Sequence, residues 1–185
     1  MASQLKPFAS RIRRYFRAYG GWSAIFRSPL FLVAVGVTAL GYGNWVSSDK
    51  WAGVSQSLIP NLLGFSLGTY AILFSLMTGR LKRALKAEKN DRGVSFLDEI
   101  NATFFHFILV QVSALIWAFL YQGTALYDLA HAIEPRWPCA PSVVAVVKAL
   151  GGAIGFVLLI YSITLIVGAA LAVYRLALIV DPHAE

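Results

Sequence analysis

The side chains with the clearest capacity for chemistry lie in the third of four apolar stretches, residues 102–124. His106 and Gln111 both fall inside it. A charge is costly in lipid, so an ionisable side chain in such a stretch usually faces protein or water. His106 stands about one turn from the predicted end of the span. It is therefore either a packing or interfacial residue, or it has a gating or proton-responsive role together with Gln111.

Motifs for catalysis, metal binding or cofactor binding are not found. The chain has no HExxH, GxSxG, phosphate-binding loop or dinucleotide fingerprint, and its single cysteine, Cys139, cannot form an intrachain disulfide. His131 and His183 lie outside the apolar stretches, so no second histidine could face His106 across a haem. We therefore expect no enzymatic activity, no metal and no cofactor.

A stripe of small or polar residues runs through the second apolar stretch. Its members recur at alternating spacings of three and four and so share one helix face: Asn61, Gly64, Gly68, Ala71, Ser75 and Thr78. Lys82 continues it. Small residues let helices approach closely, and Gly64 and Gly68 form a GxxxG pair. The same stripe repeated around an oligomer axis would line a narrow pore. Packing within the chain is the interpretation that we favour, with packing between subunits or pore lining as alternatives.

Charged residues gather at the ends of these stretches. Asp98 and Glu99 precede the third one, where a helix dipole would stabilise them; in an oligomer they could form a ring that attracts cations. Residues 1–28 place aromatic and apolar residues at helical spacing, with Arg11, Arg13, Arg14 and Arg17 mostly on the other faces. This pattern predicts an amphipathic helix in the membrane interface, bound to lipid; the alternative is a basic tail that only sets topology.

Composition explains why these features belong in a membrane. The 185 residues are 58% hydrophobic and 14% charged, against about 25% charged in a typical soluble domain. The sequence predicts an all-α integral membrane protein with an N-terminal segment, residues 1–28, and a transmembrane domain, residues 29–185. Its four spans cover about 29–46, 57–77, 102–124 and 143–180. The net charge of +7 lies beside the spans, so we expect no nucleic-acid partner.

Local signals predict where the helices begin and end. Pro29 suits the start of a helix, and Trp45 and Trp51 would bracket a polar loop, residues 47–56, as an aromatic belt. The second helix should continue past the bilayer to Lys86. Ser95 and Asp98 fit a capping box that starts the third helix.

The last apolar stretch and its surroundings carry further signals. Residues 125–142, rich in proline, should be irregular. The fourth span is long enough to require tilt, a kink near Gly151 and Gly152, or a projecting end. Glycines in the first and fourth spans predict packing seams, with Gly36, Ala39 and Gly43 in the first.

The distribution of basic residues predicts the orientation. Thirteen of the 16 lysines and arginines lie in the N-terminal segment, in residues 79–92 or at Arg175. The remaining three, Lys50, Arg136 and Lys148, fall on the other side. This bias places both termini in the cytoplasm. We expect the protein to lie in the inner (plasma) membrane of the cell.

One stretch resembles a known family. Residues 66–73, Ser-Leu-Gly-Thr-Tyr-Ala-Ile-Leu, run into Gly-Arg-Leu-Lys-Arg at 79–83, and two further spans end after Val173-Tyr174-Arg175-Leu176. This layout is similar to that of the lambda-type phage-exclusion membrane proteins of the RexB family. The resemblance implies a small four-span ion channel that depolarises an infected cell.

These observations lead to two hypotheses. The first is a small homo-oligomeric channel or pore-forming effector of a bacterial inner membrane, acting in antiviral defence. The alternative is a structural or accessory subunit of a larger membrane complex. In both cases the partners are membrane lipids and other membrane-embedded chains.

Overall fold

The computed structural model describes residues 2–124, 128, 132 and 140–180, and within these ranges the chain is helical without a β-strand. The predicted all-α class is therefore confirmed. Most of the predicted proline-rich loop, including Cys139, lies outside the described residues.

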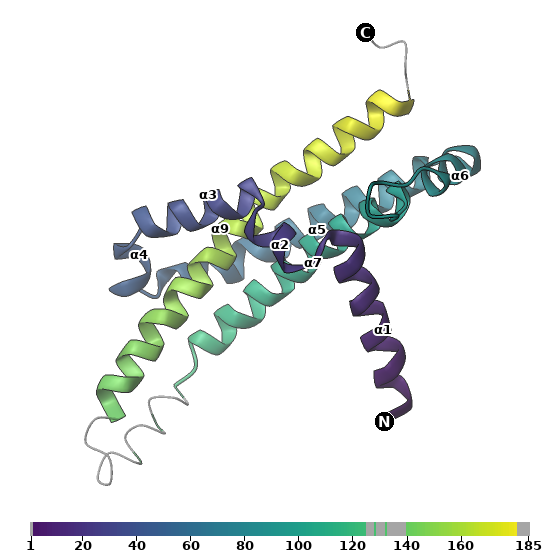
Figure 1. Ribbon diagram of the computed structural model, residues 1–185. Coiled ribbons are helices and arrows are strands. Elements are labelled where there is room, and N and C mark those ends of the chain that lie inside the picture. Colours follow the sequence, from purple (N-terminus) through teal and green to yellow (C-terminus); the bar gives the residue numbers. More distant parts are fainter. Residues whose placement is uncertain (1, 125–127, 129–131, 133–139, 181–185) are drawn as a thin grey trace.

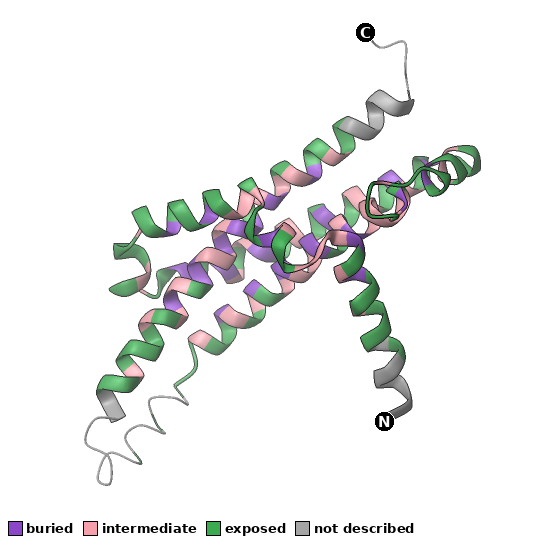
Figure 2. Cartoon of the chain, viewed as in Figure 1, coloured by how far each residue is buried: buried purple, intermediate pink, exposed green. Residues whose placement is uncertain are grey.

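Three of the described helices are long and apolar enough to cross a membrane. They are α5 (Lys50–Leu76), α7 (Phe96–Tyr121) and the Ser142–Tyr174 part of α9 (Ala140–Val180). Each of the three contacts the other two, and they form a bundle of crossing helices (Figure 1). The buried residues follow the line where they meet (Figure 2). Phe104, Tyr161 and Leu165 are fully buried and belong to one core cluster.

The first predicted span consists of two helices. α3 (Pro29–Leu40) starts at Pro29 as expected, ends before Gly41, and is followed by the short α4 (Gly43–Val46). Twelve residues of α-helix rise about 18 Å, which is less than the hydrocarbon core of a bilayer. α3 packs on α9 through Ala34 and Thr38.

The packing seam predicted for the first span is wrong. Gly36, Ala39 and Gly43 are exposed, and a Cβ on either glycine would meet no atom within 4 Å. The neighbouring helix decides which face of α3 is buried, and α9 lies on the other side.

The helix α5 starts seven residues before the predicted span, at Lys50, so the polar loop shrinks to residues 47–49. Trp51 is buried rather than part of an aromatic belt, because Gly155 of α9 leaves room for its ring. The predicted continuous helix to Lys86 is also wrong. α5 ends at Leu76, Met77 is extended, and Thr78 caps the separate helix α6 (Gly79–Ala87) by accepting from the Leu81 N–H at 3.2 Å.

The predicted start of α7 is confirmed. The Ser95 hydroxyl accepts from the backbone N–H of Asp98 at 3.2 Å. The α6–α7 connection, residues 88–95, turns at Gly93, whose φ of 71° suits a residue without a Cβ. We call the end of the bundle that carries α6 and this connection the basic end.

The N-terminal residues form α1 (Ala2–Tyr19) and the short α2 (Gly21–Phe26). Gly20, with φ of 106°, separates them. Tyr15 and Ala18 of α1 are buried near α7, while the N-terminal half of α1 leaves the bundle (Figure 1). Part of the face that the sequence assigns to lipid therefore packs on protein.

Candidate functional site

The stripe of small residues on α5 faces outward. Asn61, Gly64, Gly68, Ala71 and Ser75 are all exposed. A Cβ added to Gly64 or Gly68 would meet no atom within 4 Å. The favoured prediction, packing within the chain, is therefore wrong. The reason is that α7 and α9 pack on the opposite face of α5, where Ile59, Ser66 and Leu73 are buried.

The exposed stripe is longer than the sequence indicated. Gly53 and Ser57 are also exposed and stand eight and four residues before Asn61, so they extend the same face. The sequence analysis missed Gly53 because it placed residues 47–56 in a loop. We define the outer stripe as Gly53, Ser57, Asn61, Gly64, Gly68, Ala71 and Ser75.

The polar members of the outer stripe bond to their own helix. The Asn61 amide donates to the carbonyl of Ser57 at 3.3 Å, and the Ser75 hydroxyl donates to the carbonyl of Ile72 at 2.8 Å. Exposed apolar side chains flank the stripe, among them Phe65 and Ile72 on one side and Leu67 on the other. The result is an exposed, weakly polar strip between apolar side chains, which is a suitable surface for another helix.

Thr78 and Lys82 do not belong to this face. Thr78 lies beyond the end of α5 as the N-cap of α6. Lys82 lies on α6 with its ammonium group 5.9 Å from the centroid of the Phe74 ring. The break at residues 77–78 turns α6 away from the direction in which the sequence pattern continued.

His106 is buried at the junction of three helices. Its Nδ1 lies 2.7 Å from the Tyr15 hydroxyl of α1, and its Nε2 lies 2.8 Å from the Tyr161 hydroxyl of α9. The Tyr19 ring stacks on the imidazole with centroids 4.2 Å apart. Burial raises the pKa of Tyr15 above its usual range, so this phenol stays protonated. A neutral imidazole has one donor and one acceptor nitrogen, so one tyrosine donates to it and the other accepts.

Gln111 belongs to a different contact. Its amide Nε2 donates to the Ser66 hydroxyl of α5 at 3.0 Å, while its Oε1 is buried without a hydrogen-bond partner among the described residues. His106 faces α1 and α9, whereas Gln111 faces α5. The two predicted gating residues are therefore both buried, but they do not form one site.

The two acids at the start of α7 each have a partner within the chain. Asp98 pairs with Arg14 at 3.0 Å and also accepts from the Ser95 hydroxyl at 3.0 Å. Glu99 pairs with Arg92 at 3.4 Å and accepts from the Asn90 amide at 3.2 Å. Their position in the first turn of α7 also fits the dipole interpretation.

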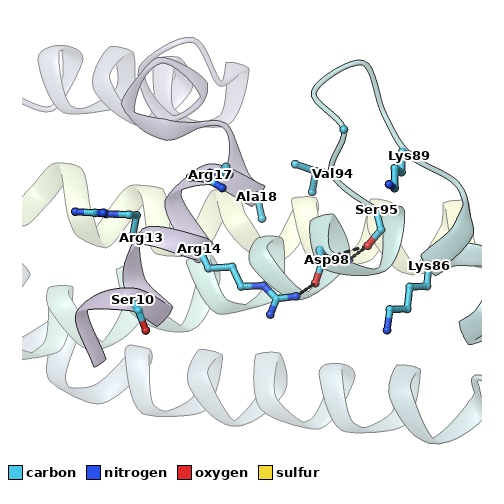
Figure 3. A pocket seen from close by; sticks show the side chains of 11 residues that line it. Ser10, Arg13, Arg14, Arg17, Ala18, Lys86, Lys89, Val94, Ser95 and Asp98 are labelled. Atoms are coloured by element: carbon cyan, nitrogen blue, oxygen red, sulfur yellow. Dashed lines mark hydrogen bonds and ion pairs between the residues drawn. The ribbon is translucent and has the colours of Figure 1, made fainter. Parts of the chain in front are cut away.

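The predicted lipid-contacting arginines of α1, Arg11, Arg13, Arg14 and Arg17, are all exposed. Three of them, Arg13, Arg14 and Arg17, line a cavity together with Lys86 and Lys89 from the α6–α7 region (Figure 3). No local pattern predicts that these two segments meet, because they are about seventy residues apart. Within the described part of the chain, no group of three or more His, Cys, Asp or Glu side chains could hold a metal ion.

The fold and these features define a small helical protein with three helices able to cross a membrane, a buried Tyr–His–Tyr junction and an exposed stripe of small residues. Comparisons with family models, with curated proteins and with solved structures give no match for this chain.

Proposed function

We propose that this chain is a homo-oligomeric membrane channel or pore-forming effector in which α5 meets copies of itself along the outer stripe. The observation that carries this proposal is the exposure of Gly64 and Gly68, with no atom of the described chain within 4 Å of a Cβ at either position. The proposal does not depend on any catalytic group.

Helices in a bilayer associate through close packing and hydrogen bonds, because apolar side chains are as well solvated by lipid as by protein. A face built from glycine, alanine and serine gains little packing energy from contact with lipid. It gains much more from contact with a closely packed helix. Around a symmetry axis, the same face leaves a narrow passage lined by backbone and small side chains.

The proposed topology has four spans, with both termini in the cytoplasm of a bacterial inner membrane. α3 and α4 together form the first span, and α5, α7 and α9 form the others. Support comes from the distribution of lysines and arginines, which places the basic end inside. The exposed arginines of α1 support a position of this helix at the inner membrane surface.

Conductance of the purified protein in planar bilayers tests the channel directly. We expect discrete conductance steps from the native chain. Gly64→Leu/Gly68→Leu should abolish them and dissociate the oligomer while leaving the chain folded, because each new side chain points away from the rest of the chain.

Gly36→Leu is the matched control. It adds the same side chain to an exposed glycine of α3 that also has no neighbour within 4 Å, and it should leave conductance unchanged. Bilayers that stay silent at high protein loading, with no leakage of dye from liposomes, would refute the channel.

The alternative function, an accessory subunit of a larger complex, uses the same outer stripe against a different protein. It predicts that the chain is monomeric in mild detergent and co-purifies with unrelated membrane subunits. A symmetric homo-oligomer that the Gly64→Leu/Gly68→Leu variant dissociates would exclude it.

A role in antiviral defence is supported by the resemblance of residues 66–83 to the phage-exclusion family. It predicts that infected cells carrying the native chain lose their membrane potential, as a voltage-sensitive dye would report. Cells carrying the Gly64→Leu/Gly68→Leu variant should keep it. Equal potentials in both would reject the defence role.

A further inference from the structure

A basic cavity of about 570 Å³ lies between α1 and the α6–α7 region at the basic end. Arg13, Arg14 and Arg17 line it from α1, and Lys86 and Lys89 line it from the other side (Figure 3). Asp98 is its one acidic lining residue among those described. Five cations therefore surround a space of the size that commonly holds a small ligand.

Most of these cations lack a carboxylate partner. Arg14 pairs with Asp98, whereas Arg13, Arg17, Lys86 and Lys89 form no ion pair with any residue that the structure describes. Like charges held around one cavity repel each other, so an anion that binds there relieves this repulsion. Phosphate groups offer several oxygens to guanidinium and ammonium donors and suit such a cavity.

A second cavity, of about 450 Å³, adjoins the first. The two share Arg14, Ala18 and Asp98. The remaining lining of the second cavity is largely apolar or aromatic and includes Ile12, Tyr15, Ala102 and Phe105. A basic cavity and an apolar cavity thus meet at the Arg14–Asp98 pair.

We propose that this pair of cavities binds an anionic phospholipid, with the phosphate among the arginines and lysines and the start of an acyl chain beside Ile12 and Phe105. A free phosphate compound would use only the basic cavity. The location also favours a lipid, since the cavities lie where α7 passes from its charged first turn into its apolar part. The inference rests on α1, α6 and α7 and is independent of the outer stripe.

The test uses the full chain in an uncharged mild detergent, with binding followed by native mass spectrometry and by thermal unfolding. Dioctanoyl phosphatidylglycerol should bind and raise the unfolding temperature. Dioctanoyl phosphatidylcholine should bind about tenfold more weakly, because its headgroup has no net charge. Inorganic pyrophosphate should give no comparable shift.

Two charge variants distinguish lipid binding in the cavity from lipid binding to a generally basic surface. Arg17→Gln/Lys89→Gln removes two unpaired lining cations and should weaken phosphatidylglycerol binding about thirtyfold. Arg27→Gln/Lys50→Gln removes the same charge at exposed positions outside both cavities and should change binding by less than about twofold. Ile12→Gln should weaken lipid binding through the apolar cavity. Each variant should unfold at the native temperature without lipid.

Four results would overturn the proposal. They are no binding of phosphatidylglycerol, equal binding of phosphatidylcholine, an equal shift with pyrophosphate, and equal losses in the two charge variants. The third result would indicate a site for a soluble phosphate compound, and the fourth would indicate a surface effect of charge.

Discussion

The glycines of α9 and those of α5 have similar sequence contexts and opposite surroundings. A Cβ at Gly155 would fall within the ring of Trp51, and a Cβ at Gly152 would lie 2.6 Å from the carbonyl oxygen of Trp45. The same atom at Gly64 or Gly68 would meet nothing within 4 Å. In α9 these glycines pack closely against other helices of the same chain, whereas in α5 they lie on an exposed face.

A stripe of small residues therefore indicates close packing without indicating the partner. In α9 the partners are known: Trp51 of α5 packs over Gly155, and Phe107 of α7 lies beside Gly168. In α5 the described chain provides no partner for the outer stripe.

Gly155→Leu should have the largest effect. The new side chain would occupy the space of the Trp51 ring, which is buried. We expect a loss of about 3 kcal/mol or more in the free energy of unfolding, measured as aggregation or a lowered unfolding temperature in detergent. Gly64→Leu is the matched control and should unfold like the native monomer. Similar losses in both variants would remove the distinction between the two helices.

His106→Phe should have a smaller effect. It removes the hydrogen bonds that the imidazole forms with Tyr15 and Tyr161, at a cost of about 1–2 kcal/mol. Since His106 connects α1 to α7 and α9, we expect faster proteolysis at the arginines of α1. Ser113→Ala, at an exposed position of the same helix, should not change that rate. Unchanged protection of α1 in His106→Phe would show that the junction does not hold this helix.

Gln111→Met should change stability by less than about 1 kcal/mol. It breaks the contact with Ser66, and interhelical hydrogen bonds in membranes contribute about 0.6 kcal/mol on average. It also removes the Oε1 atom, which is buried without a partner among the described residues. Thermal unfolding of the two proteins side by side measures the difference. A loss above about 2 kcal/mol would show that Oε1 has a partner in the assembled protein.

Ala71→Cys should leave stability unchanged and report on the outer stripe instead. In a Cys139→Ser background, oxidation should link two chains through residue 71, visible as a dimer in denaturing gels. Ala39→Cys, at an exposed alanine of α3, is the matched control and should stay monomeric. Equal crosslinking at both positions would mean random collision in the membrane rather than a defined interface.

The sequence alone determined the helical class, the approximate place of the long apolar helices and the capped start of α7. These features depend on composition, periodicity and short-range bonds, such as that between Ser95 and the N–H of Asp98. It failed at residues 77–78, where a local threonine cap interrupts a sequence rich in helix formers. It also misplaced Trp51, whose burial depends on a glycine about a hundred residues away.

The tertiary structure alone decided which small-residue faces are buried and which are exposed. Periodicity places residues on one side of a helix, but the neighbouring helices choose the side that is covered. For this reason Gly155 and Gly68 could not be told apart by their spacing. The basic cavity likewise exists only because α1 folds back against α7, which brings Arg17 near Lys86. Long-range contacts of this kind leave no local pattern in the sequence.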